Sequence, residues 1–150
     1  MGTNKSKDKG TRNEAALKKL LRDKTGLKWE RTPGSGALDE KHFLKGDLYV
    51  PNEKNIYSVE VKAYKDNHLN HTLLLGTNCQ LDRWWEQTDR QGEQMEREGL
   101  LIFKHDRSKW ICMFQSDTKP KAIHLYYSKL RTYICRLEEW LELDNPEFIL

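Results

Sequence analysis

The chain has 150 residues, enough for one domain with its own core; 33% of the residues are charged and the net charge is +3. Five Trp, six Tyr and four Phe argue against general disorder, and the lack of an apolar run of about 18 residues excludes a transmembrane helix. Three cysteines without a C-x-x-C motif, and an N-terminus without an apolar signal segment, predict an intracellular, cytoplasmic protein in a reducing compartment.

The front of the chain is basic, with ten Lys and Arg against four Asp and Glu in residues 1–31. We expect residues 1–10 to form a flexible basic arm, which either contacts a polyanion or is simply solvated. A helix then begins at Thr11, because Thr11 as N-cap and Glu14 three residues later make a capping box. Gly26 ends this helix.

Two strand signals follow a loop rich in Pro, Gly and Ser at residues 32–36. Residues 47–50 predict a short strand that Pro51 stops, and residues 56–64, rich in β-branched and aromatic side chains, predict a longer one. The turn between them contains Pro51 and Asn52, which suits a hairpin.

The next segments predict a helix and then a second hairpin. Apolar residues at helical spacing run from residue 78 to 98, and Gly99 is the expected stop. Trp84 and Trp85 lie on this apolar stripe, so we expect them in the core and not stacked on bases. Residues 100–104 and 110–114 are the strands of the hairpin.

The last part predicts a short strand at residues 122–126 and a final helix that Ser128 caps. One face of that helix carries Leu130, Tyr133, Ile134, Leu137 and Leu141. The element order predicts an α/β fold in which helices flank a mixed β-sheet, as a single domain over residues 11–143. An acidic and apolar tail at 144–150 is expected to pack on the domain; docking to another protein is the alternative.

The residues that carry chemistry lie on the predicted hairpin. Strand alternation places Glu60 and Lys62 on one face, and the hairpin brings Asp47 near Glu60. Two carboxylates and the Val61 carbonyl make an oxygen-only site that suits Mg²⁺ or Mn²⁺. With Lys62 to orient a water, the set fits hydrolytic phosphoryl transfer. The alternative for Glu60 and Lys62 is a salt bridge on a solvent-facing surface.

Asp47, twelve intervening residues and then Glu60-Val61-Lys62 resemble the D-x(n)-E-x-K signature of the PD-(D/E)xK nuclease superfamily. Gly46 stands where that superfamily usually carries a proline. Residues 31–37, an arginine followed by Thr-Pro-Gly-Ser-Gly-Ala, are similar to the loop that precedes the aspartate in archaeal-type Holliday junction resolvases. The glutamine that those resolvases carry at the start of the next helix corresponds to Gln80.

The resemblance implies a restriction-endonuclease-like core over roughly residues 10–115 and a role for each matching residue. The metal ligands would be Asp47, Glu60 and the Val61 carbonyl, supported by Glu14, with Lys62 positioning the attacking water. Ser35 would contact the scissile phosphate and Gln80 would orient the water or Lys62. The structural alternatives are a plain capping box for Glu14, a turn for Ser35 and a solvent-facing first helical turn for Gln80.

The implied function is a Mg²⁺-dependent DNA endonuclease that cuts branched DNA, similar to the Holliday junction resolvases and acting as a homodimer. The departures from the resolvase pattern point to a phage or mobile-element relative. The expected DNA contacts are Arg31, Ser35, Lys5, Lys7, Lys9 and Arg12. The alternatives are a restriction-type endonuclease or recombination exonuclease with the same core, and a nucleic-acid-binding module without catalysis.

Overall fold

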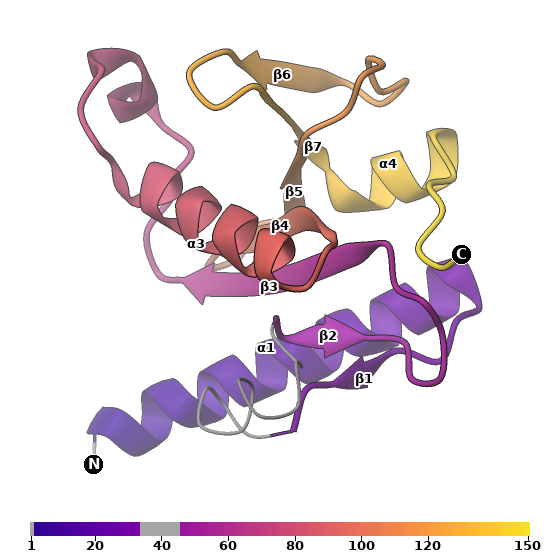
Figure 1. The fold of residues 1–150 in the computed structure, drawn as a ribbon. Helices are drawn as coiled ribbons and strands as arrows, with labels where there is room; N and C mark the ends of the chain where they lie inside the picture. Colours follow the sequence, from indigo (N-terminus) through magenta and orange to yellow (C-terminus); the bar gives the residue numbers. More distant parts are fainter. Residues whose placement is uncertain (1, 34–45) are drawn as a thin grey trace.

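The computed structural model describes residues 2–33 and 46–150, and the side chains of these residues apart from 2–9 and 11. The elements are α1 (Gly2–Thr25), β1 (Glu30–Arg31), β2 (Leu48–Tyr49), β3 (Tyr57–Tyr64), the 3₁₀ helix η1 (His71–Leu75), α3 (Gln80–Gln94), β4 (Glu98–His105), β5 (Ile111–Phe114), β6 (His124–Tyr127), β7 (Thr132–Arg136) and α4 (Leu137–Leu143) (Figure 1). Within these residues, no helix is both long and apolar enough to cross a membrane.

All seven strands belong to one mixed sheet, in the order β1-β2-β3-β4-β5-β7-β6. Strands β3 and β4 are parallel, because α3 connects them as a crossover, and every other pair is antiparallel. Both predicted hairpins are present: Leu48 of β2 pairs with Val59 of β3, and Ile102 of β4 pairs with Cys112 of β5. The prediction of a mixed sheet flanked by helices is confirmed.

Alternate residues of the central strands fill two hydrophobic layers, one on each side of the sheet. Leu100 and Ile102 of β4 join a cluster that includes Leu17 and Leu21 of α1. Their neighbours Leu101 and Phe103 join a second cluster, in which α3 contributes Leu81, Trp84 and Trp85. Figure 1 shows α3 on one side of β3 and α1 on the other. The prediction that both tryptophans lie in the core is confirmed.

The first helix begins at Gly2 and not at Thr11, so residues 2–10 are its first turns in place of the expected arm. Thr11 lies inside the helix and forms no N-cap, which removes the predicted capping box. The segment before it has no proline, and its lysines lose little rotamer freedom in a helix. Gly10 lowers the helix propensity by only about 1 kcal/mol, so it does not end the helix.

The helix α3 ends at Gln94, earlier than the predicted stop at Gly99. The chain turns there because Glu96 adopts a left-handed conformation with φ of 56° and the Arg97 N–H donates to the Gly92 carbonyl at 2.8 Å. From Glu98 onward the backbone pairs with β3, and this pairing extends the strand beyond its predicted start.

The prediction of one long final helix is wrong. Residues 132–136 form β7, which pairs with both β5 and β6, and only residues 137–143 are helical. Thr132, Tyr133 and Ile134 are β-branched or aromatic, which favours a strand. As a strand they pair with β5 on one side and with β6 on the other. The apolar spacing on which the prediction rested does not distinguish a buried strand from a helix over so few residues.

The C-terminal tail packs on the domain, as expected. Phe148 is buried in the first hydrophobic cluster, with its ring edge-on to Trp29 at a centroid distance of 5.2 Å. Its carbonyl accepts a hydrogen bond from the Ile56 N–H, and Ile149 forms a β-bridge with Asn55. The apolar residue most suited to dock into a partner is therefore used inside the fold.

Candidate active site

The backbone of Asp47 is held on both sides by neighbouring strands. Its N–H donates to the Val59 carbonyl at 2.6 Å, and its carbonyl accepts from the Thr32 N–H at 2.9 Å. Its side chain is fixed as well, because Oδ2 accepts a hydrogen bond of 2.7 Å from the Val61 N–H. The register of β2 and β3 thus aims the Asp47 carboxylate at the middle of β3.

Gly46 makes this close approach sterically feasible. Its φ is +86°, and a Cβ at this position would lie 2.8 Å from the Val59 carbonyl oxygen and 3.2 Å from Ser58 Oγ. Proline cannot adopt this φ, because its ring fixes φ near about −65°. The departure from the superfamily pattern at this residue is therefore a local backbone requirement.

Glu60 and Lys62 project from the same face of β3, the face that α3 covers. Glu60 is only 6% exposed, and Lys62 Nζ lies 3.4 Å from its Oε1. The Nε2 atom of Gln87, on α3, lies 3.5 Å from the same oxygen. The ion pair that was the alternative to a catalytic role is present, but it is largely buried and so does not lie on a solvent-facing surface.

The carboxylates of Asp47, Glu60 and Glu14 lie close together in a site that is partly shielded from water. The pKa of Asp47 is raised to about 8, because burial and the neighbouring Glu60 and Glu14 raise it more than the Val61 hydrogen bond and Lys62 lower it. A divalent cation would relieve this repulsion, and the oxygen donors present are those that Mg²⁺ and Mn²⁺ prefer. The residues therefore fit such an ion.

The described residues contain no cluster of three acidic, His or Cys side chains that could hold a metal by themselves. Asp47 and Glu60 would supply two ligands. The Val61 carbonyl is on the same side of β3 as its N–H, which bonds to Asp47, because both groups of a residue point to one neighbour in an antiparallel ladder. The remaining positions would fall to water or substrate oxygens, as is usual for Mg²⁺.

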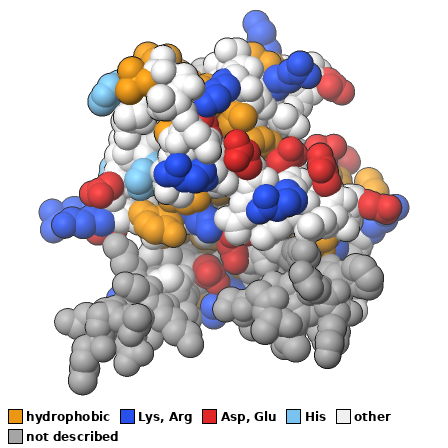
Figure 2. Space-filling view, turned by 60° about the vertical axis from the view of Figure 1, so that its left-hand side comes forward, with side chains coloured by type: hydrophobic (Ala, Val, Ile, Leu, Met, Phe, Trp, Pro, Cys, Tyr) orange, Lys and Arg blue, Asp and Glu red, His pale blue; other side chains and the backbone are white. Residues whose placement is uncertain are grey.

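Glu14, Asp47, Glu60 and Lys62 line one open groove of about 470 Å³, which extends along β3 to Tyr64. Across the middle of the face shown in Figure 2, acidic side chains lie next to basic ones. Glu14 comes from inside α1, and its Oε2 accepts a hydrogen bond of 2.9 Å from Arg31 Nε. Val61 also lines the groove, so the structure brings together five residues that the sequence singled out: Glu14, Asp47, Glu60, Val61 and Lys62.

The role of Gln80 stays a prediction, and the structure places a second glutamine of the same helix beside Glu60. Gln80 is the first residue of α3, and its Oε1 accepts a hydrogen bond of 3.3 Å from Arg83. The glutamine beside Glu60 is Gln87, two helical turns further along the same face. The sequence contained one hint of this: Gln87 lies two helical turns after Gln80, so both glutamines share one face of the helix.

The other predicted DNA contacts lie partly outside the described residues. Ser35 is outside them, and so are the side chains of Lys5, Lys7 and Lys9 on α1. Arg12 is exposed on α1, two residues before Glu14.

Comparison with known proteins gives three similarities. A family model described as "Phage putative PDDEXK endonuclease" matches residues 5–147. The chain is 39% identical over 155 residues to Protein D14 of Escherichia phage T5, and the match covers 97% of each chain. The structure is similar to that of Hjc, a Holliday junction resolvase of Archaeoglobus fulgidus, with a TM-score of 0.45 and 17% identity over 87% of this chain and 90% of that one.

Proposed function

The chain belongs to the phage PDDEXK endonuclease family, and we propose that it is a divalent-metal-dependent endonuclease. The resemblance of residues 31–37, Asp47 and Glu60-Val61-Lys62 to archaeal-type Holliday junction resolvases favours branched DNA as its substrate. The observation that carries the proposal is the placement of Asp47 beside Glu60 across β2 and β3, with Lys62 on the same face. A desolvated carboxylate pair can hold a divalent cation, and an adjacent ammonium group can position a water, which suits metal-assisted phosphodiester hydrolysis.

Asp47, Glu60 and the Val61 carbonyl hold the cation, with Mg²⁺ as the proposed ion and Mn²⁺ as the alternative. When bound, the cation supplies the positive charge that offsets negative charge developing on the phosphate. The Val61 N–H keeps the Asp47 carboxylate turned toward Glu60. Glu14 supports the cation or its water from α1.

Lys62 positions the attacking water through its Nζ. Gln87, in the place expected for Gln80, holds Glu60 and keeps its carboxylate oriented. In the reaction, the water oxygen forms a bond to phosphorus as a bridging P–O bond breaks, and the leaving oxygen takes up a proton. The chain's own contribution is to orient these groups before the substrate arrives.

The proposed phosphate contacts lie on α1, on β1 and in the residues that follow β1 in the sequence. They are Arg31, Ser35, Lys5, Lys7, Lys9 and Arg12. Because Lys and Arg contacts release counterions from DNA, binding through them weakens as salt rises. Reversing the charge of Arg12, which is exposed, should lower the salt dependence of binding without changing the cleavage step.

We further propose that the protein acts as a homodimer in the cytoplasm of a phage-infected cell. Symmetric cutting of two strands requires two active sites, and a two-fold dimer provides them. Light scattering of the purified protein at several concentrations, with and without DNA, measures the stoichiometry. A monomer in all conditions would contradict this part of the proposal.

The substrate class is tested with a labelled four-way junction and a linear duplex of matched sequence, each incubated with Mg²⁺ or with EDTA. Paired cuts in the junction alone, lost with EDTA, support a resolvase-like enzyme. Equal cutting of both DNAs supports a duplex endonuclease of the same core, and digestion from ends alone supports an exonuclease. Tight binding without any cutting would overturn the catalytic proposal.

A further inference from the structure

A second pocket, separate from the active-site groove, lies at the carboxyl ends of β3 and β4. Its volume is about 190 Å³, and it shares no lining residue with the groove. Its apolar walls are the rings of Trp84 and Phe103 together with Ile111, and His68 lines it from the segment after β3. It is smaller than the roughly 300–1,000 Å³ pockets that enclose drug-sized ligands.

Tyr64 connects the pocket to the groove. It lines the groove, is 47% exposed, and its ring lies 5.1 Å from that of Trp84, with the planes 31° apart. The His68 ring lies 5.0 Å from Trp84 and 6.2 Å from Tyr64, both edge-on. Aromatic surface therefore continues from the groove into the pocket.

The pocket is close to the proposed point of cleavage. Tyr64 follows Glu60 by four residues on the same face of β3, which is about 13 Å along an extended strand. This length corresponds to about four nucleotide steps of about 3.4 Å each. A strand cut at Glu60 would therefore pass the mouth of the pocket within a few nucleotides.

Cations surround the pocket. Lys104, Lys109 and Arg136 line it, whereas Asp66 is the one carboxylate that lines it among the residues that the structure describes. Lys104 Nζ lies 5.4 Å from the centre of the Trp110 ring, and Arg136 also pairs with Glu139 at 3.7 Å. Aromatic walls with a cationic rim are the combination that receives an unstacked base and its phosphate.

We propose that this pocket receives one unpaired nucleotide of the DNA substrate, and so selects DNA with an unpaired base near the cut. The base lies against His68 and against the small exposed parts of Trp84 and Phe103, whose side chains otherwise belong to the core, and its phosphate contacts Lys104 and Lys109. The inference rests on the proposed nuclease function and deepens it, because an unpaired nucleotide enters the pocket without the cost of breaking a base pair. A paired base would first have to be unpaired and unstacked, so it enters the pocket less readily.

The test uses the full-length protein in EDTA, so that nothing is cut, and duplexes with or without a single bulged 2-aminopurine. We expect about tenfold tighter binding of the bulged duplex, with quenching of its fluorescence, and no quenching of a paired 2-aminopurine. Equal affinity for the two duplexes without quenching would overturn the proposal.

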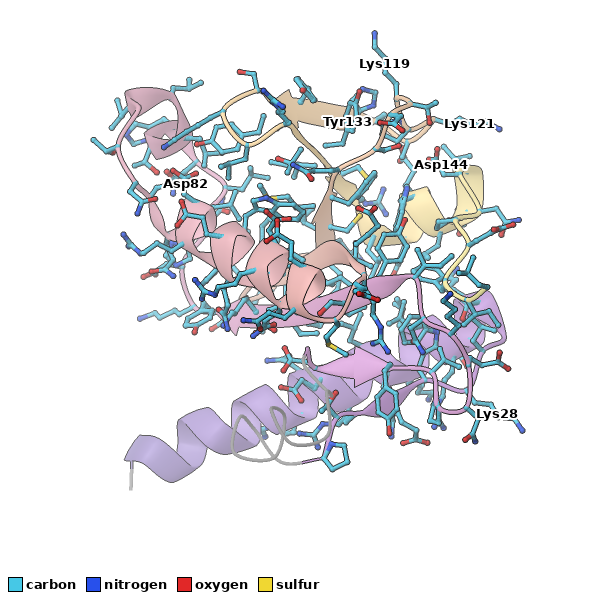
Figure 3. The ribbon with its side chains drawn as sticks, in the orientation of Figure 1. Lys28, Asp82, Lys119, Lys121, Tyr133 and Asp144 are labelled. Carbon is cyan, nitrogen blue, oxygen red and sulfur yellow. The ribbon has the colours of Figure 1, made fainter. Side chains whose placement is uncertain are left out.

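Variants locate the effect. His68→Ala combined with Lys109→Glu should reduce the affinity ratio to about one and abolish quenching. Lys109→Glu alone, at an exposed residue, serves if the double variant is unstable, and should reduce the ratio several-fold. Lys119→Glu is the matched charge control: this exposed lysine, labelled in Figure 3, follows β5 at the end opposite Ile111. A ratio that falls equally in the control would contradict the pocket as its source.

Cleavage of the same duplexes in Mg²⁺ separates this inference from the proposed function. Bulge preference and quenching without any cutting would support the pocket and overturn the nuclease. Cutting with no bulge preference, or with a preference unchanged in Lys109→Glu, would support the nuclease and overturn the pocket.

Discussion

The Val61 N–H donates a 2.7 Å hydrogen bond to Asp47 Oδ2. The Asp47 carboxylate therefore takes the place of the backbone carbonyl that would accept this bond in a regular sheet. An asparagine at position 47 keeps an oxygen for this bond but has no charge for a cation. We expect Asp47→Asn to fold normally and to lose cleavage by more than about 100-fold, measured as initial rates in Mg²⁺. Activity above a tenth of wild type would contradict the role of Asp47.

Gly46→Ala tests how closely β2 must approach β3. The new Cβ would meet the Val59 carbonyl oxygen at 2.8 Å, in addition to the strain of a positive φ. Gly26→Ala is the control, since its φ is also positive, at +73°, but nothing lies within 4 Å of the added atom. In urea unfolding we expect Gly26→Ala to cost about 1 kcal/mol and Gly46→Ala about 2–3 kcal/mol. Equal losses would argue against the close approach.

Divalent cations should stabilise the folded protein, because they relieve the repulsion between Asp47 and Glu60. Binding only the native state stabilises it by about 2.7 kcal/mol when the ion is at 100 times its Kd. We expect Mg²⁺ to raise the Tm of wild type, measured by differential scanning calorimetry, and to leave that of Glu60→Gln unchanged. The same rise in both proteins would show that the ion binds elsewhere.

The buried carboxyl group of Asp82, on α3, should make the free energy of unfolding fall at acid pH (Figure 3). Its side chain is fully buried, and it accepts hydrogen bonds from Lys129 Nζ at 2.6 Å and from the Tyr127 hydroxyl at 2.8 Å. Burial by itself would raise the pKa of Asp82, but the bonds from Lys129, Tyr127 and Cys79 outweigh it and lower the pKa below 3.8.

A carboxyl whose pKa is lower in the folded state stabilises the protein above its unfolded value, and this contribution is lost as pH falls through the folded pKa. We therefore expect the free energy of unfolding to fall below about pH 4 in wild type and less steeply in Asp82→Asn. The variant should also be about 1–3 kcal/mol less stable at neutral pH. Urea midpoints from pH 7 to pH 3 measure both effects, and parallel curves would contradict this linkage.

The sequence was sufficient to predict the centre of the fold. Alternation along residues 56–64 placed Glu60 and Lys62 on one face, and the turn after Val50 brought Asp47 to them, because a hairpin register follows from local residues. The parallel pairing of β3 with β4 follows from the helix between them.

The errors lie where tertiary contacts decide. Residues 132–136 become a strand because β5 and β6 leave a gap between them, which no local pattern reveals. Gln87 was not singled out, although it lies two helical turns after Gln80, because only the packing of α3 on β3 shows that this turn contacts Glu60. The second pocket, at the carboxyl ends of β3 and β4, is lined by four segments that lie far apart in the sequence. The spacing of residues along the chain therefore could not have predicted it.

Metal-dependent hydrolysis at Asp47 and Glu60 is tested most directly by comparing DNA cleavage by wild type and by Glu60→Gln. Both proteins are incubated with labelled junction and duplex, in Mg²⁺ and in EDTA, after circular dichroism has verified that the variant is folded. We expect cutting by wild type in Mg²⁺ only, and none by the folded variant. Equal cutting by Glu60→Gln, or cutting in EDTA, would contradict this expectation.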